Sequence, residues 1–240
     1  MSLSLTSRRV GDVTVVTCSG RIVAGAESES LQKSLDELLT FSPHILLHLG
    51  GVDFIDSAGL GLLARYLTRV QNASGTLKIC AVSPKIDDVL RITRLKAVFQ
   101  PYETEADPIT EVHRRVRLKP DTTGSLASDA LSNPDVLCVD ESDDVLAYLR
   151  ELLKRAGYRA ITAANLPDAL ILLKATGPKV VVISAALRAA RSTRAAVEFH
   201  KSAESLSMIE LLPDFSAHDA GDAGTQVLDA VRQTLPLARG

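Results

Sequence analysis

The residues best suited to chemistry lie in the segment VDFIDSAGLGLLARYL, residues 52–67. Here an apolar stretch meets a helical pattern at Asp56 and Ser57, and serine is a preferred helix N-cap because its hydroxyl accepts a free backbone N–H. Ala58 and Gly59 keep the first turn small, so another molecule can approach the backbone closely. A capping serine, with glycines that let the helix pack tightly on a sheet, is the purely structural alternative.

A dinucleotide site and a nucleophilic serine are the two enzymatic alternatives for this segment. GLGLLA fits the Gly-x-Gly-x-x-Ala fingerprint, but that fingerprint needs an acid at the end of the next strand, where residues 81–83 are Ala, Val and Ser. The nucleophile elbow needs glycine two residues before the serine, where this chain has Ile55. His48 is nearby in sequence, but nothing in the pattern makes it a base for Ser57. The sequence therefore predicts no catalytic residue and no cofactor.

The elements that position this segment alternate between strand-like and helix-like patterns. The strands are β-branched or continuously apolar, and the helices repeat apolar residues every three to four positions. Ser83 and Pro84 fit the start of a short helix, because proline suits a first turn. This order predicts a mixed sheet with packed helices. The expected strands cover residues 13–20, 44–49 and 77–82, and the expected helices cover residues 28–39, 60–70 and 84–92.

A second α/β pattern begins at residue 135. The strand DVLCVDES ends in the acid pair Asp140 and Glu141, and the helix after it ends near Gly157. A strand (158–163), a helix (167–177) and the strand VVVIS (180–184) follow, which predicts a parallel, right-handed sheet. The remaining sequence supplies one helix, DAGDAGTQVLDAVRQTL, and no obvious companion strand.

The segment HRRVRLKPDTTGSLASDALSNP separates the two patterns. It has no apolar periodicity, is rich in Pro, Gly, Ser, Thr and Asp, and is too long for an ordinary loop inside a compact domain. We therefore expect a domain over residues 1–112, a linker over residues 113–134 and a second domain over residues 135–240.

Composition excludes several classes of protein. The 240 residues carry 27 Lys+Arg and 29 Asp+Glu, a net charge of −2 that argues against direct nucleic-acid binding. No apolar run approaches the roughly 20 residues of a membrane span, and the first residues do not resemble a signal peptide. Three cysteines (Cys18, Cys80 and Cys138) lie in strand-like runs without metal-ligand spacing, so we expect small core residues in a reducing cytoplasm.

Three segments of the first half, GDVTVVTCSGRIVAG, HLGGVDFIDSAGLGLLARYL and LKICAVSPKIDDVLRITRLKAVFQPY, together resemble a STAS domain of the bacterial anti-sigma factor antagonists (anti-anti-sigma factors). The resemblance implies that Ser57 is phosphorylated by a partner kinase, an anti-sigma factor with a histidine-kinase-like ATPase fold, and that a phosphatase reverses this. It implies that the unphosphorylated form binds the kinase and releases a sigma factor. The partner-binding residues carried over are Asp56, Ser57, Ala58 and Gly59.

This sequence departs from the family pattern at two places. Residues 48–50 read His-Leu-Gly, where relatives often place an acid or Asn before the Leu, and Arg94 stands where a Gly is common. Neither departure removes Ser57. They put partner choice in doubt.

The second half resembles a response-regulator receiver, a flavodoxin-like parallel α/β domain, in a shortened form. Asp140 and Glu141 match the receiver's acid pair, but Ser184 stands at the acceptor position and no Lys follows Lys201. Two acids alone are a poor Mg²⁺ site, so we expect a pseudo-receiver without metal, used for docking or dimerisation.

These resemblances lead to two hypotheses of function. The first is a phosphorylation-controlled partner switch in the cytoplasm, without enzymatic activity. A phosphate on Ser57 adds about −1.5 to −2 charges at a helix N-terminus, which tolerates an anion, so the switch should act mainly by blocking an interface. The alternative is a STAS-based scaffold or polarity protein, whose assembly into large complexes is tuned by phosphorylation. Particle size distinguishes the two.

Overall fold

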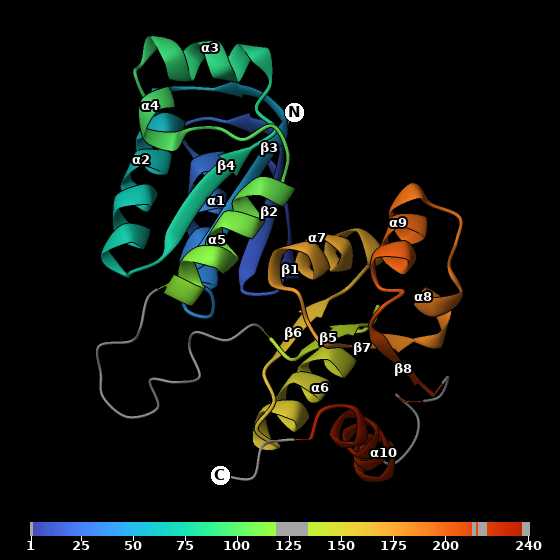
Figure 1. Ribbon diagram of the computed structural model, residues 1–240. Helices are drawn as coiled ribbons and strands as arrows, with labels where there is room; N and C mark the ends of the chain where they lie inside the picture. The colour runs from blue at the N-terminus through green and yellow to red at the C-terminus, as the bar shows by residue number, and fades with distance from the viewer. Residues whose placement is uncertain (1, 119–133, 213–214, 216–219, 237–240) are drawn as a thin grey trace. The chain divides into compact units, whose positions relative to one another are not determined.

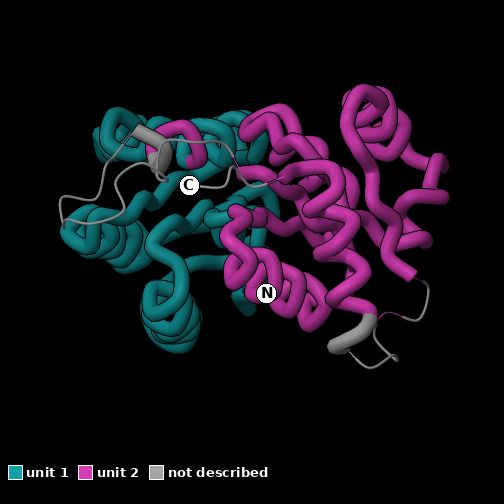
Figure 2. The backbone as a smooth tube through the Cα atoms, turned by 60° about the horizontal axis from the view of Figure 1, so that its bottom comes forward, with its two compact units in different colours: residues 1–112 teal, residues 113–240 magenta. Residues whose placement is uncertain are grey.

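The computed structural model describes residues 2–118, 134–212, 215 and 220–236. The chain divides into two compact units, residues 1–112 and residues 113–240, coloured separately in Figure 2. Each unit buries its own apolar core. A core of its own is what an independently folding domain requires.

The sheet of the first unit has four strands in the spatial order β4-β3-β2-β1. β1 and β2 form an antiparallel hairpin around Gly11, whose φ of 60° suits glycine, whereas β2–β3 and β3–β4 pair in parallel. The sheet is therefore mixed, as predicted. The strands are β1 (Ser4–Val10), β2 (Val13–Ile22), β3 (His44–Ile55) and β4 (Thr76–Cys80).

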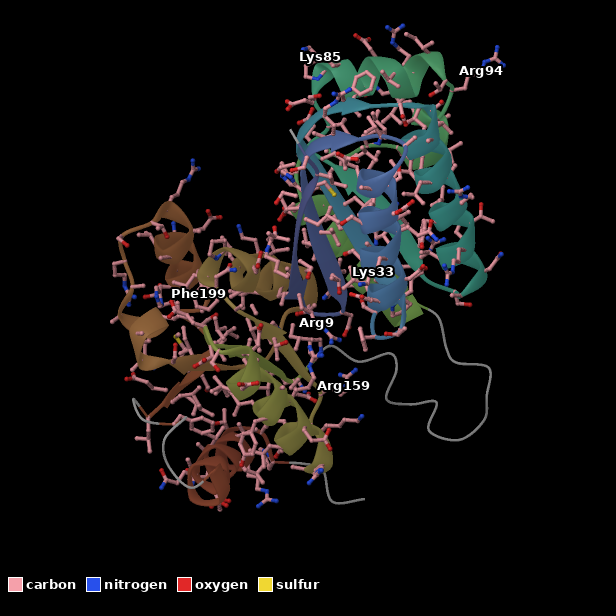
Figure 3. All side chains as sticks on the ribbon, turned by 180° about the vertical axis from the view of Figure 1, so that it is seen from behind. Arg9, Lys33, Lys85, Arg94, Arg159 and Phe199 are labelled. Atoms are coloured by element: carbon pink, nitrogen blue, oxygen red, sulfur yellow. The ribbon has the colours of Figure 1, made fainter. Side chains whose placement is uncertain are left out.

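Helices cover both faces of this sheet. Side chains of α1, α2 and α3 join one apolar cluster with β2, β3 and β4, because alternate strand residues point to that face. Figures 1 and 3 show α5 on the face opposite α1. There Lys78 of β4 reaches Glu111 of α5 at 3.1 Å. The helices are α1 (Ala26–Leu39), α2 (Ser57–Asn72), α3 (Pro84–Ile92), α4 (Lys96–Phe99) and α5 (Ala106–Leu118).

Helix α5 corrects part of the linker prediction. It continues to Leu118, so residues 113–118, the start of the predicted linker, are helical. Ile109, Val112 and His113 are buried at helical spacing, a short apolar face that the charged residues after it concealed. Residues 119–133 of the predicted linker lie outside the described residues.

The second unit has four parallel strands in the order β6-β5-β7-β8. In chain order this is 2-1-3-4, the first four positions of a common doubly wound arrangement. Gly157, with φ 87°, follows the end of α6 as predicted. The strands are β5 (Val136–Val139), β6 (Ala160–Ala163), β7 (Val180–Ser184) and β8 (Ser207–Leu211), and the helices are α6 (Asp143–Arg155), α7 (Leu166–Thr176), α8 (Ala185–Ala189), α9 (Arg194–Ser202) and α10 (Ala220–Thr234).

Strand β8 shows that one expectation was wrong. The sequence pattern predicts no strand after Ser184, yet β8 pairs in parallel with β7 along its whole length. It is the last strand of this order, and Ser207 and Glu210 are exposed, so its SMIEL sequence lacks the continuous apolar run of a central strand.

The three cysteines are core residues, as predicted. Cys18, Cys80 and Cys138 are free and have no exposed surface. Burial raises the pKa of each thiol to about 12. Thiols held protonated in this way are poor nucleophiles and poor metal ligands.

Candidate functional site

The junction between β3 and α2 is built around Asp56. Strand β3 ends at Ile55, α2 begins at Ser57, and Asp56 between them is the N-cap, whose Oδ1 accepts a hydrogen bond from the N–H of Gly59 at 2.8 Å. The structural alternative, in which Ser57 caps the helix, is therefore wrong, because the Asp56 carboxylate already does so. Ser57 is the first helical residue and is exposed.

Asp56 also joins the helix start to the end of β2. Its Oδ2 accepts a hydrogen bond from the N–H of Ala24 at 2.9 Å, and its own N–H donates to the carbonyl of Ile22 at 3.1 Å. The hydrogen bonds from Gly59 and then Ala24 lower the pKa of the Asp56 carboxyl. The carboxylate is thus held ionised, with both oxygens engaged by backbone N–H groups.

Gly59 fills a place that only glycine fits. A Cβ there would lie 2.6 Å from the carbonyl oxygen of Ile22 and 2.9 Å from Cγ1 of Ile55. The family resemblance places Gly59 at a partner-binding face, but in the structure it is buried, and its small size serves the contact between α2 and the sheet. At Gly61, by contrast, a Cβ would meet nothing within 4 Å.

The exposed start of α2 is suited to an anion. Ser57 and Ala58 are both exposed, and the first turn carries no acidic side chain. Backbone N–H groups at a helix N-terminus, together with the helix dipole, favour negative charge there. A phosphate attached to the Ser57 hydroxyl would meet that field.

Two neighbours of this junction were missed from the sequence. Arg21 of β2 and Phe54 of β3 are register partners, and the Arg21 guanidinium lies over the Phe54 ring at 5.0 Å from its centroid. Both side chains are exposed, Phe54 by 47%. The pairing of β2 with β3 shifts register twice, so sequence spacing alone does not place Arg21 opposite Phe54.

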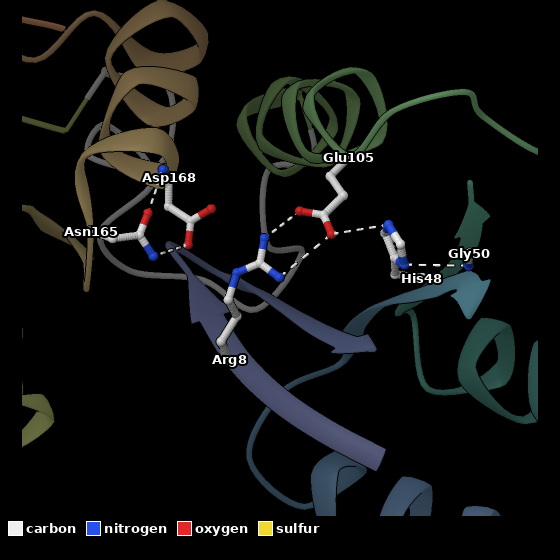
Figure 4. Close-up of polar contacts among 6 residues, drawn as sticks. All are labelled: Arg8, His48, Gly50, Glu105, Asn165 and Asp168. Atoms are coloured by element: carbon white, nitrogen blue, oxygen red, sulfur yellow. Dashed lines mark hydrogen bonds and ion pairs between the residues drawn. The ribbon is translucent and has the colours of Figure 1, made fainter. Parts of the chain in front are cut away.

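His48 does not serve Ser57. Its Nε2 lies 3.9 Å from Glu105, and its Nδ1 accepts from the N–H of Gly50 at 3.4 Å. Glu105 is also ion-paired with Arg8 of β1 (Figure 4). The imidazole is therefore committed to a cluster between the sheet and the start of α5, and these contacts give Ser57 no general base.

In the second unit the predicted acids and Ser184 lie at the carboxyl ends of two neighbouring parallel strands. Asp140 and Glu141 follow β5, and Ser184 ends β7, which pairs in parallel with β5. Burial raises the pKa of the Asp140 carboxyl, although its Oδ1 accepts from the N–H of Ser142 at 2.8 Å. The Ser184 hydroxyl oxygen is buried and, among the described residues, makes no hydrogen bond.

Polar side chains also fix the start of α7. Asn165 caps α7, and it exchanges two hydrogen bonds of 2.9 Å with Asp168 (Figure 4).

In the described part of the chain, no three His, Cys, Asp or Glu side chains are grouped so as to hold a metal ion. Across the same residues, none of the helices combines the length and hydropathy that a bilayer span requires.

Comparisons with known proteins relate the first half of the chain to one domain family. Residues 4–107 match the family model of the STAS domain. The "Anti-sigma F factor antagonist" of Paenibacillus polymyxa is 25% identical over 114 residues, which are 47% of this chain and 97% of that protein. The crystal structure of an anti-sigma factor antagonist from Mycobacterium paratuberculosis is 23% identical with a TM-score of 0.40, over 46% of this chain and 94% of that one.

A shorter match concerns a different protein. "Protein Rrf1" of Nitratidesulfovibrio vulgaris is 42% identical over 52 residues, which are 22% of this chain. This chain spans 38% of the length of that protein.

Proposed function

We propose, from the match of residues 4–107 to the STAS domain family model and from the similarity to an anti-sigma factor antagonist at 25% identity, that the protein is a partner switch controlled by phosphorylation of Ser57. The unphosphorylated STAS domain binds an anti-sigma factor that is itself a serine kinase, and this releases a sigma factor. Phosphorylation by the same kinase ends the complex, and a phosphatase restores it.

The observation that carries this proposal is the exposed Ser57 hydroxyl on a rigid support. Asp56 caps the helix and joins it to β2, so Ser57 is presented at a fixed position. Both carboxylate oxygens of Asp56 are occupied, so Asp56 positions Ser57 and leaves proton removal to the kinase. An exposed, well-positioned hydroxyl is what a protein kinase needs from its substrate.

The same geometry supports a switch that acts at the interface. A phosphate brings about −1.5 to −2 charges and three strong acceptor oxygens. The N-terminus of α2 accommodates them, so the fold of the domain should not change. A partner seated over Ser57 and Ala58 would meet a bulky, hydrated dianion, and its affinity would fall.

For the second unit we infer a pseudo-receiver role, which its strand order and the residues at the carboxyl ends of β5 and β7 support. The order 2-1-3-4 of its parallel strands matches the first four strands of a flavodoxin-like domain, and Asp140 and Glu141 follow β5, where the resemblance to receivers places an acid pair. Ser184 replaces the acceptor carboxylate. We assign this unit to docking or dimerisation.

The test uses partners captured from a native cell extract by the full chain and by Ser57→Ala, identified by mass spectrometry. A captured kinase, purified and given ATP, should add one phosphate to the wild type and none to Ser57→Ala. Thr68→Ala is the matched control, because Thr68 is an exposed hydroxyl on the same helix, and it should be labelled like the wild type. Labelling of Ser57→Ala at the wild-type rate, or a phosphate mapped to another residue, would overturn the proposal.

A further inference from the structure

Arg21 and Phe54 form an exposed cation–π pair beside the proposed phosphorylation site. The guanidinium carbon lies 5.0 Å from the ring centroid, and 47% of Phe54 is exposed. Exposed cation–π contacts are weak, so Arg21 is oriented by the ring but can exchange it for a stronger partner. Arg21 makes no ion pair within the described part of the chain.

Backbone hydrogen bonds bring this pair to the start of α2. The carbonyl of Ile22, one residue after Arg21, accepts from the N–H of Asp56, one residue before Ser57. The N–H of Ala24 donates to the carboxylate of Asp56. The hydrogen bonds from Gly59 and Ala24 are the main causes of the lowered pKa of Asp56, and the charge of Arg21 makes a smaller contribution in the same direction. The end of β2 that carries Arg21 is therefore hydrogen-bonded to the residue that precedes Ser57.

We propose that Arg21 is the residue that responds to the modification. Its guanidinium leaves the ring of Phe54 and pairs with a phosphate on Ser57. This inference rests on the proposed function, because it assumes that Ser57 carries phosphate in one of its two states. It adds a second element to the switch, since modification would change both the charge at Ser57 and the surface made by Arg21 and Phe54.

The charges around the pair favour this transfer. The nearby acids are Asp53, which is exposed, and Asp56, whose two oxygens already accept backbone hydrogen bonds. A phosphate offers three acceptor oxygens, and arginine binds phosphate through paired, charge-assisted hydrogen bonds that exceed an exposed cation–π contact. A dianion on Ser57 would therefore be a stronger partner for Arg21 than the ring of Phe54 or the occupied carboxylate of Asp56.

The consequence for binding is a surface that changes composition. In the unmodified protein the Arg21 guanidinium lies over the ring of Phe54, and both residue types are enriched in protein interfaces. With Arg21 drawn to the phosphate, Phe54 loses its cationic cover. A partner that places a carboxylate opposite Arg21 and an apolar group on Phe54 would lose both contacts together.

The test uses full-length protein with phosphoserine incorporated at position 57 during synthesis, so that no kinase is required. The second ionisation of that phosphate, whose ordinary pKa is about 6, is followed by phosphorus NMR over a pH titration. Pairing with Arg21 favours the dianion. The second pKa of the phosphate should therefore be about half a pH unit lower in the protein that retains Arg21 than in Arg21→Gln, as for an exposed ion pair. Arg65→Gln is the matched control, because Arg65 is an exposed arginine further along α2, and its titration should follow the Arg21 protein.

A fluorescence experiment reports whether Arg21 leaves the aromatic ring at position 54. The chain has no Trp, so Phe54→Trp introduces a single reporter. Its emission should differ between serine and phosphoserine at position 57, and Arg21→Gln should abolish that difference. Phe41→Trp, in the exposed loop before β3, should show no difference in either background.

The outcomes separate the two proposals. Equal phosphate titrations in the Arg21 protein and in Arg21→Gln, or a Trp response that survives Arg21→Gln, would overturn the role of Arg21 while leaving the partner switch intact. If no kinase modifies Ser57, the partner switch fails, and the incorporated phosphoserine still shows whether Arg21 binds it.

Discussion

At the scale of single residues, the site depends on a division of labour between neighbours. Asp56 caps α2, joins it to β2 and remains ionised, whereas Ser57 contributes an exposed hydroxyl. A reactive serine in a hydrolase would need a base beside it, and His48 is engaged with Glu105 instead. The arrangement therefore suits a residue that another enzyme modifies.

The first prediction concerns the charge at Ser57. Ser57→Asp should weaken binding of the partner kinase at least tenfold, about 1.4 kcal/mol, because a carboxylate enters the interface. Its effect should remain smaller than that of phosphate, since Asp carries one negative charge. Calorimetric titration of the wild type, Ser57→Asp and the phosphorylated protein checks this. Equal affinity for all three would contradict an interface-blocking switch.

The second prediction concerns the pH dependence of Asp56. Its pKa is lower in the folded protein than the unfolded value of about 3.9, so the ionised carboxylate stabilises the fold above that value, and this stabilisation is lost as the pH falls through the lower folded pKa. Asp56→Asn retains a capping side chain but no charge, and should unfold at lower urea than the wild type at pH 7. The difference between the two proteins should shrink as the pH falls below 3.9. A difference that is constant over this range would contradict the role of the charge.

At the scale of elements, two glycines in the same helix have opposite tasks. Gly59 touches the backbone of β2, and Gly61 faces open space. Gly59→Ala should destabilise the protein by about 1–3 kcal/mol, the usual cost of overpacking. Gly61→Ala should stabilise it by about 0.5–1 kcal/mol, because alanine favours a helix interior. Urea unfolding of the two variants checks the contrast, and two changes of the same sign would refute it.

Helix α5 provides a second test at this scale. Ile109 has no exposed surface, so Ile109→Ala should lower the free energy of unfolding by about 2–4 kcal/mol. Thr110→Ala, an exposed residue on the same helix, should change it by less than about 0.5 kcal/mol. If both variants unfold like the wild type in urea, α5 is not part of the fold of the first unit.

Some elements were predictable from sequence and others were not, for reasons of pattern strength. The central strands β2, β3 and β7 are continuously apolar or β-branched, and helix α2 has a strong apolar face, so periodicity identifies them. Strands β1 and β8 lie at the ends of their units' strand orders and carry polar residues. The site shows the same limit: the IDSAGLG motif indicates Ser57, but either Asp56 or Ser57 satisfies the cap preference, and only the backbone decides between them.

At the scale of the whole chain, one unit carries Ser57, the proposed phosphorylation site, and the other carries Asp140, Glu141 and Ser184 at the carboxyl ends of β5 and β7. The two units have separate cores, so each can respond to its own partners. Ser57 should then be the one residue through which phosphate controls the described part of the chain. This expectation is testable because receivers, unlike STAS domains, accept phosphate from small donors.

The last prediction is that the second unit takes no phosphate from acetyl phosphate and Mg²⁺. The Ser184 hydroxyl is buried without a hydrogen-bond partner among the described residues, so no base activates it, and an alcohol without a base is a weak nucleophile. Phosphoryl transfer also needs a metal and a cation to neutralise charge. Asp140 and Glu141 supply only two acids, and no group of three metal-ligating side chains occurs among the described residues. Intact mass of the full chain should stay unchanged after incubation, while a functional receiver treated in parallel gains one phosphate. A stoichiometric gain that disappears in Asp140→Ala would mean that this edge of the sheet holds a working acceptor, and that phosphate enters the protein at two places.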